Sequence, residues 1–245
     1  MYEDICYRRN NVKEVICRLD FASNLDVFKN TMPKQIYDIV KKHYPIAEPQ
    51  DVIGTQLQIS PGNTSLNNII SKKWIFLSLD RKSRCSIDTE SVIFSATKYN
   101  RFEEFVRGVN DILQSVMKAY REIPGKRLGL RYINELPLKE NEEWINNKFL
   151  NALLEHKNRD TTKLLTQFEY AVLEKGINVR LQYGYLNPDY PSILKNEIFT
   201  IDMDAYSTGL IYAEDVAALI EDMHFEDQNC FETMITDTYR DELNK

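Results

Sequence analysis

Trp74-Ile-Phe-Leu-Ser-Leu-Asp80, Arg84-Cys-Ser-Ile-Asp88 and Ser91-Val-Ile-Phe-Ser-Ala-Thr-Lys-Tyr99 are the three consecutive stretches that decide the fold. Each run is short and rich in β-branched and aromatic residues, and short polar breaks such as Asp80-Arg-Lys-Ser83 separate them. This spacing is typical of strands joined by tight turns. The three runs therefore predict an antiparallel meander, and Val52–Ser60 is expected to supply another strand of the same sheet.

A long helix is expected directly after the meander. Asn100 stands at the position of an N-cap, and Glu103 follows three residues later, which is the spacing of a capping box. Pro124-Gly125 should end the helix. Between these limits the apolar residues recur at helical spacing and form one stripe: Phe102, Phe105, Val106, Val109, Ile112, Leu113, Val116, Met117 and Tyr120.

The rest of the chain repeats this order of elements. Glu14–Phe21 predicts a strand, and Pro33 and Pro45 bound an expected helix. After the long helix come an expected strand (Arg127–Leu136), a helix (Glu142–His156), three strands (Leu164–Glu174, Ile177–Tyr185 and Glu197–Tyr206) and a final helix (Ala213–Asp241). Both halves follow the order β-α-β(n)-α. We therefore predict an α+β fold, an antiparallel sheet packed by long amphipathic helices, as two duplicated lobes (1–126 and 127–245) in one compact unit.

A duplicated unit of this kind resembles the saddle folds of the TATA-binding type and, more loosely, the helix-grip ligand binders. In both, a curved sheet holds a helix on one face. A likeness at the level of fold carries little information about function.

Composition and charge narrow the class of protein. Hydrophobic residues make up 43% of the 245 residues and charged residues 28%, as in ordinary folded proteins. The first ten residues are polar and no apolar run has the length of a membrane span, so a cytoplasmic protein without a membrane partner is expected. The four cysteines form no C-x-x-C pair and are expected to be reduced.

The negative charge is concentrated near the C-terminal end of the sequence. Residues 213–245 contain ten acids and two bases, a net of -8, so the remainder must sum to +2 to give the total of -6. A solvated helix face is the favoured interpretation, and docking of a basic partner is the alternative. Basic clusters elsewhere are small, which makes nucleic-acid binding an unfavoured hypothesis although aromatic residues for base stacking are plentiful.

No motif of catalysis or cofactor binding is complete. Gly125-Lys126 is followed by Arg127 where a phosphate-binding loop needs Ser or Thr. His224-Phe-Glu226 resembles the start of a zinc deaminase signature, but the required P-C-x-x-C is missing. The sequence therefore predicts no catalytic residues, no metal ligands and no cofactor.

Polar residues at alternate strand positions form the candidate site. Successive side chains of a strand point to opposite faces, so residues two or four apart share one face. If the strands adjoin, one face carries both charges and offers a groove for a polar ligand or peptide, with paired carboxylates able to hold a divalent cation. Cross-strand ion pairs worth roughly 0.2–1 kcal/mol each are the favoured alternative. The residues are Arg127 and Arg131, Arg180 and Gln182, and Asp202 and Asp204.

The final helix adds two unusual residues. Asp227 falls within the apolar stripe traced by Val216, Ile220 and Met223, and His224 lies three residues before it. Either the two side chains satisfy each other at the edge of the core, or the helix breaks near 226–228.

Several strings of the sequence are distinctive: Arg127-Leu-Gly-Leu-Arg-Tyr-Ile-Asn134, the most specific, with Trp74–Asp80, Tyr99–Phe105, Ile201-Asp-Met-Asp204, His224, Phe231-Glu232 and Ile235-Thr236. Together they resemble a sporadically distributed family of bacterial proteins of similar length, known as a numbered family of unknown function. The resemblance spans the chain from Glu14 onward, although the chain lacks the family's proline-rich start. It implies an accessory role such as a defence or toxin–antitoxin system, and it marks Arg127, Arg131, Asn134, Asp202, Asp204 and His224 as positions of interest.

Three functions stay open at this point. The leading hypothesis is a non-enzymatic binding protein that acts on a protein or a small polar ligand through its sheet face or its acidic terminal helix. The second is a metal-dependent hydrolase or nuclease that uses Asp202 and Asp204. The third is a saddle that binds nucleic acid.

Overall fold

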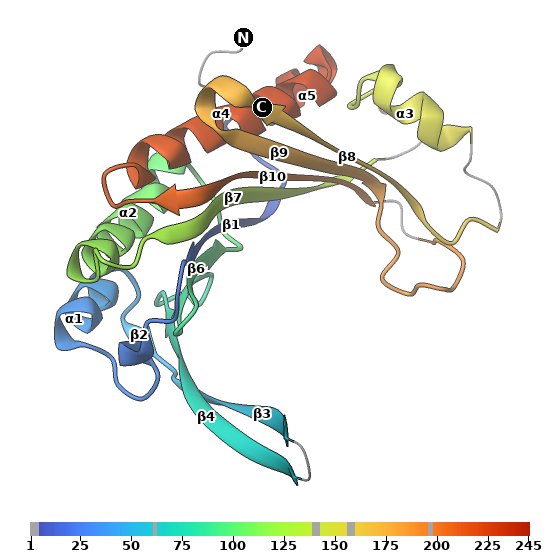
Figure 1. Ribbon diagram of the computed structural model, residues 1–245. Helices are drawn as coiled ribbons and strands as arrows, with labels where there is room; N and C mark the ends of the chain where they lie inside the picture. Colours follow the sequence, from blue (N-terminus) through green and yellow to red (C-terminus); the bar gives the residue numbers. More distant parts are fainter. Residues whose placement is uncertain (1–4, 61–62, 139–142, 156–159, 196–197) are drawn as a thin grey trace.

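The structure is a computed structural model that describes residues 5–60, 63–138, 143–155, 160–195 and 198–245. Its strands and helices alternate much as the sequence predicts (Figure 1). In chain order they are β1 (Val12–Phe21), α1 (Lys34–His43), β2 (Ile46–Ala47), β3 (Gln50–Ser60), β4 (Asn63–Leu77), β5 (Ser83–Ile87), β6 (Ser91–Ala96), α2 (Phe102–Ala119), β7 (Gly125–Pro137), α3 (Asn147–Leu154), β8 (Leu164–Val172), β9 (Ile177–Tyr185), β10 (Ile198–Ile211), α4 (Val216–Met234) and α5 (Asp237–Leu243).

One antiparallel sheet extends through both predicted lobes. Its strand order is β2-β4-β5-β6-β1-β7-β10-β9-β8, and β3 pairs only with β4. The first strands of the two halves, β1 and β7, pair with each other at the centre, and the later strands of each half lie outward from them. The α+β class with an antiparallel sheet is confirmed. A duplication of the sequence stays a prediction.

The sheet is curved, and its two faces differ. In Figure 1, α1, α2 and α4 lie against the convex face, and none of the described helices lies in the hollow of the arc. Alternation within β1 explains this arrangement, because Val15, Cys17 and Leu19 are fully buried toward the helices while Ile16 and Arg18 face the hollow. The core therefore fills the space between the sheet and the helices, and the concave face stays available.

Helix α2 has the predicted stripe but begins later than expected. Val109, Ile112 and Val116 are fully buried. Arg101 occupies the N-cap in an extended conformation without a side-chain cap. The prediction that Asn100 caps the helix is therefore wrong, because the Asn100 amide donates to Glu104 at 3.1 Å instead.

The C-terminal segment is two helices where one was predicted. The backbone becomes extended at Ile235, and Thr236 Oγ1 accepts a hydrogen bond from the Tyr239 backbone N–H to cap α5. Helix α4 is continuous through 226–228, so the predicted break at that point is wrong. Among the described residues, no helix has the length and apolar character that crossing a bilayer requires.

A long β3–β4 hairpin projects from one end of the arc (Figure 1). Strand β4 begins at Asn63, eleven residues before the predicted start at Trp74. Val52, Ile53 and Ile70 on this hairpin are exposed by 45%, 68% and 57%. Apolar side chains of this size are exposed here without cover from the rest of the described chain.

Candidate functional site

Six of the predicted residues lie together on the concave face. Strands β7, β10 and β9 are neighbours, and Arg131 is paired in register with Asp204, which is paired with Arg180. Asp202 is in register with Gln182 on the other side of β10. Arg127 lies four residues before Arg131 on the same face. The adjoining strands that the sequence argument required are present.

The opposite charges on this face are paired. Arg131 donates two hydrogen bonds to Asp202, from Nε at 2.7 Å and from Nη2 at 2.5 Å. Arg127 Nη2 lies 3.2 and 3.1 Å from the two carboxylate oxygens of Asp204. Arg180 donates from Nε to Glu169 at 3.0 Å. We call these residues, Arg127, Arg131, Arg180, Glu169, Asp202 and Asp204, the concave ladder.

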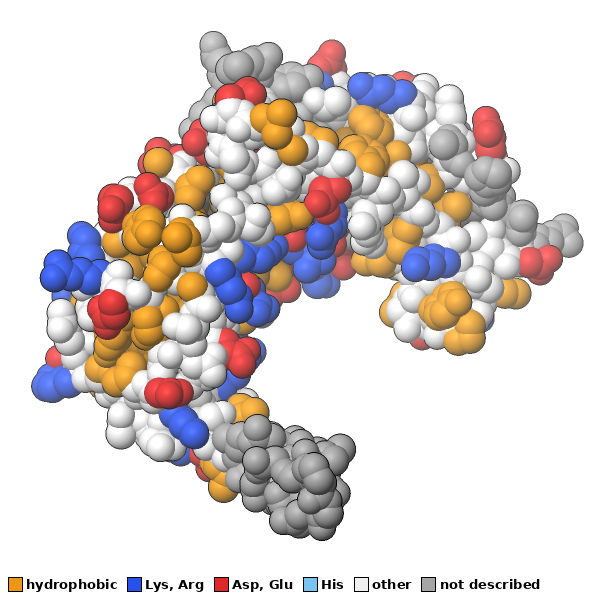
Figure 2. Space-filling view, viewed as in Figure 1, with side chains coloured by type: hydrophobic (Ala, Val, Ile, Leu, Met, Phe, Trp, Pro, Cys, Tyr) orange, Lys and Arg blue, Asp and Glu red, His pale blue; other side chains and the backbone are white. Residues whose placement is uncertain are grey.

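The arginine side chains of the ladder are more exposed to solvent than its aspartate side chains. The Arg131 and Arg180 side chains are exposed by 42% and 44%, whereas those of Asp202 and Asp204 are exposed by 14% and 16%. Burial raises the pKa of the Asp204 carboxyl, and the charges of Arg127, Arg131 and Arg180 act in the opposite direction. A partner that approaches this face would therefore meet guanidinium groups first (Figure 2).

Gly129 and Tyr206 shape the centre of the ladder. A Cβ atom on Gly129 would stand 2.8 Å from Arg127 Nη1, so the glycine leaves the room in which this guanidinium lies. The Tyr206 ring lies 4.8 Å below the Arg127 guanidinium, and its hydroxyl donates to Glu169 at 2.6 Å. Beside these residues is a hollow of about 440 Å³ to which Ile16, Ile93 and Arg131 contribute.

Metal binding by Asp202 and Asp204 would have to displace arginines. Each carboxylate already accepts hydrogen bonds from a guanidinium. Among the described residues, no group of three or more His, Cys, Asp and Glu side chains is arranged to hold a metal ion. Ion pairing across the strands, which the sequence argument favoured, is what this geometry provides.

Asn134 and His224 lie on the other side of the sheet. Asn134 follows Arg131 by three residues on β7, so its side chain points to the opposite face of the sheet. Asn134 is only 4% exposed. His224 lies on α4. Both line a pocket of about 120 Å³ between the N-terminal segment, β7, β10 and α4, which we call the convex pocket. The eight predicted residues thus divide between two separate surfaces.

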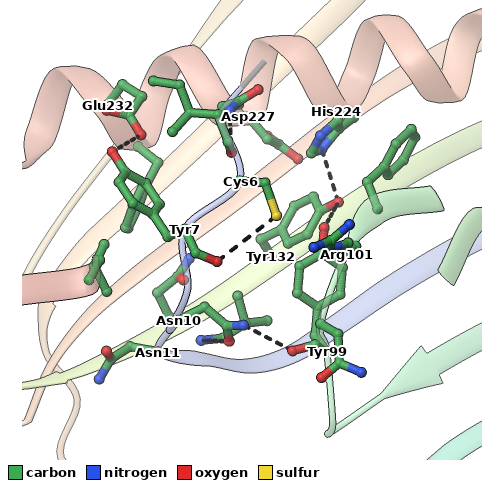
Figure 3. A pocket seen from close by; sticks show the side chains of 18 of the residues that line it. Cys6, Tyr7, Asn10, Asn11, Tyr99, Arg101, Tyr132, His224, Asp227 and Glu232 are labelled. Atoms are coloured by element: carbon green, nitrogen blue, oxygen red, sulfur yellow. Dashed lines mark hydrogen bonds between the residues drawn. The ribbon is translucent and has the colours of Figure 1, made fainter. Parts of the chain in front are cut away.

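The convex pocket is lined largely by rings. His224 stacks on Phe102 with 3.9 Å between the ring centroids, and its Nδ1 lies 3.0 Å from the Tyr132 hydroxyl. The Tyr132 hydroxyl is also 3.3 Å from that of Tyr99. Figure 3 shows these side chains on one side of the N-terminal segment that carries Cys6 and Tyr7. The histidine is therefore held in a fixed orientation by a ring on one side and a tyrosine hydroxyl on another.

Asp227 is the unusual group of this pocket. It is 1% exposed, and neither carboxylate oxygen has a hydrogen-bond partner among the described residues. Burial is the main reason why the pKa of this carboxyl lies well above its usual range, and the charge of Asp204 acts in the same direction. An interaction with the Ala205 backbone N–H, which falls short of hydrogen-bond geometry, acts against it. The two predicted explanations for Asp227, a bond to His224 or a helix break, are both wrong.

The N-terminal segment is tied down across the pocket. Tyr7 donates from its hydroxyl to Glu232 at 2.7 Å, and Gln228 donates to the Ile5 carbonyl at 3.0 Å. Glu232 is 1% exposed and also accepts from Arg240 at 2.8 Å. Sequence reasoning missed Tyr7 and Tyr132, which are distant along the chain. The available signal was an acid, Asp227, in an apolar helical stripe.

Comparison with family models and with curated proteins finds no match to this sequence. The resemblance to the numbered bacterial family therefore stays a prediction.

Proposed function

We propose that this chain is a non-enzymatic binding protein that docks a partner protein against its concave face. The observation that carries the proposal is a curved, continuous sheet with one face free of the described helices and covered by the concave ladder. A continuous sheet of this shape gives a partner a rigid surface with a large contact area. It does not enclose a reaction centre.

The residue types of the concave face support a protein partner. Arginine and tyrosine are enriched at the centres of protein interfaces. Here Arg131 lies beside the half-buried Ile16 and Ile93, and Arg180 and Tyr206 lie farther along the same face on β9 and β10. Because the arginines are more exposed than their acidic partners, a partner protein would meet guanidinium groups first, although the three arginines and three acids of the ladder balance in charge. The cross-strand pair Ile53 and Ile70 on the β3–β4 hairpin offers further exposed apolar surface at one end of the arc.

Nucleic acid is the less favoured partner. Phosphate binding needs several unpaired cations along one surface, whereas each arginine of the ladder already pairs with an acid. A hydrolase at Asp202 and Asp204 is also less favoured because both carboxylates are engaged by guanidinium groups. The accessory bacterial setting implied by the family resemblance stays a prediction.

Photo-crosslinking in the native host tests the proposal. A photoreactive amino acid replaces Gln182 on the concave face or, as a control, Lys118 on the exposed side of α2. We expect a discrete protein adduct from position 182 alone, and we expect Arg180→Asp to reduce its yield about tenfold because the exposed guanidinium is lost.

Two outcomes would overturn this function. One is an adduct of equal yield from positions 182 and 118, which would mean that the concave face is not selective. The other is an adduct that disappears on nuclease treatment, which would identify nucleic acid as the partner.

A further inference from the structure

The convex pocket contains a carboxyl group that the fold alone does not explain. Asp227 lies on α4 among residues that are fully buried, such as Ile220 and Met223, and both of its oxygens lack a partner among the described residues. A buried polar group without a partner is unfavourable for stability. Because the Asp227 carboxyl lies beside a pocket of about 120 Å³, a ligand in that pocket could supply the missing partner.

The charges around Asp227 favour a cation. Asp204 and Asp202 on β10 and Glu226 on α4 each act to raise the pKa of Asp227, although Arg127 and Arg131 pair with the first two on the other face of the sheet. Among the described residues that line the pocket, the acids Glu103, Asp227 and Glu232 outnumber the one arginine, Arg101, which is exposed. A cation entering the pocket would stabilise the ionised carboxylate, which would release its proton to solvent.

The rings of the pocket favour an organic cation over a metal ion. Tyr7, Tyr99, Phe102, Tyr132 and Phe231 contribute aromatic surface. Aromatic faces attract ammonium groups through the ring quadrupole, and cages of this kind recognise alkylated ammonium ions. No group of three or more His, Cys, Asp and Glu side chains in the described part of the chain is arranged here to hold a metal ion.

The size of the pocket limits the ligand. An engineered cavity of about 150 Å³ binds benzene, which has six non-hydrogen atoms, so a pocket of about 120 Å³ holds about five. We propose that the convex pocket binds a small organic ammonium group, with Asp227 as its counter-ion and the tyrosine and phenylalanine rings as its cage. This inference is independent of the proposed docking function, because the pocket lies on the opposite side of the sheet.

Titration of the purified full chain with matched ligands tests the site. Propylammonium and tetramethylammonium supply the charge, and 1-propanol is the uncharged counterpart of propylammonium. Ligands of four or five non-hydrogen atoms bind no more tightly than about 1–100 μM, so calorimetry and thermal shift should cover concentrations from this range up to about 100 mM. N-acetyl-lysine methylamide distinguishes a free amine from a lysine side chain of another protein.

We expect saturable binding of at least one ammonium ligand and no saturable binding of 1-propanol. Asp227→Asn keeps the shape and removes the charge, so it should weaken ammonium binding at least tenfold. Glu221→Gln removes an equal charge from the exposed side of α4 and should leave binding unchanged. Phe231→Leu keeps Asp227 but removes one ring, and it should weaken tetramethylammonium binding several-fold.

Three results would overturn the site. They are equal binding of propylammonium and 1-propanol, undiminished ammonium binding by folded Asp227→Asn, and the absence of saturable ammonium binding to the wild-type chain. The Phe231→Leu variant keeps the test decisive if Asp227→Asn does not fold, because unchanged tetramethylammonium affinity in Phe231→Leu would exclude the cage.

Discussion

Replacing Asp227 with leucine is expected to raise the free energy of unfolding by about 1–3 kcal/mol, the range associated with an unsatisfied buried polar group. The side chain is 1% exposed and both oxygens lack a hydrogen-bond partner among the described residues. Leucine would continue the apolar stripe of α4 toward the sheet. A substitution that stabilises the chain and abolishes ammonium binding would identify Asp227 as a residue retained for function.

The gain in stability from Asp227→Leu should depend on pH. The folded-state pKa of Asp227 is raised, so in the range above the unfolded pKa of about 4 the folded chain keeps a proton that the unfolded chain loses. The contribution of this group to stability is therefore complete below about pH 4 and falls as the pH rises through the folded-state pKa. The advantage of Asp227→Leu should grow across the same range.

Urea unfolding at pH 4.5 and pH 7 measures both effects. Glu221→Leu, on the exposed side of the same helix, serves as the control and should change stability by no more than about 0.5 kcal/mol. A leucine variant that is less stable than the wild type at both pH values would show that the Asp227 carboxyl has a stabilising partner, contrary to this account.

Reversing one charge of the concave ladder is expected to destabilise the chain by about 1–2 kcal/mol, and reversing both should restore most of the loss. Arg131→Asp places a third carboxylate beside Asp202 and Asp204. Asp202→Arg leaves two guanidinium groups facing each other. The expected losses of stability are modest because the Arg131 side chain is 42% exposed and water screens its charge.

Urea unfolding of the two single variants and of the double variant Arg131→Asp/Asp202→Arg gives the coupling directly. The differences should shrink in 1 M salt, because screening weakens the repulsion. The exposed pair Lys34–Asp38 on α1 is the matched control, and its single reversals should change stability by about 0.5 kcal/mol or less. Additive losses without recovery in the double variant would mean that the two residues do not interact.

The sequence predicted the strands of the sheet well because their alternation is local. Strand β9 has the predicted bounds Ile177–Tyr185, and β7 differs by only a residue or two at each end. The start of β4 was missed because its first residues, Asn63–Asn68, are polar except for Leu66 and pair only with β3. The division between α4 and α5 was missed because the extended conformation of Ile235 is fixed by a bridge to Ile145, distant in the chain.

The candidate site was only half predictable for a related reason. Period-two alternation places Arg127, Arg131, Asp202 and Asp204 on common faces, and the register joins them. The same rule places Asn134, three residues after Arg131, on the opposite face. Membership of one sequence motif with Arg127 and Arg131 does not reveal this difference. The convex pocket draws on the N-terminal segment, β7 and α4 together. No local pattern brings Tyr7, Tyr132 and Asp227 to one place.

Cysteine accessibility inside the native host tests the docking claim most directly. Ser95→Cys, which is paired in register with Ile16, reports the concave face, and Lys118→Cys reports the outer side of α2, both in a Cys6→Ser background because the other cysteines are buried. We predict that a permeant maleimide labels position 95 at least tenfold more slowly in cells than in the purified protein, while position 118 is labelled alike in both. Equal labelling of position 95 in cells and in the purified protein would contradict the proposal that a partner occupies the concave face.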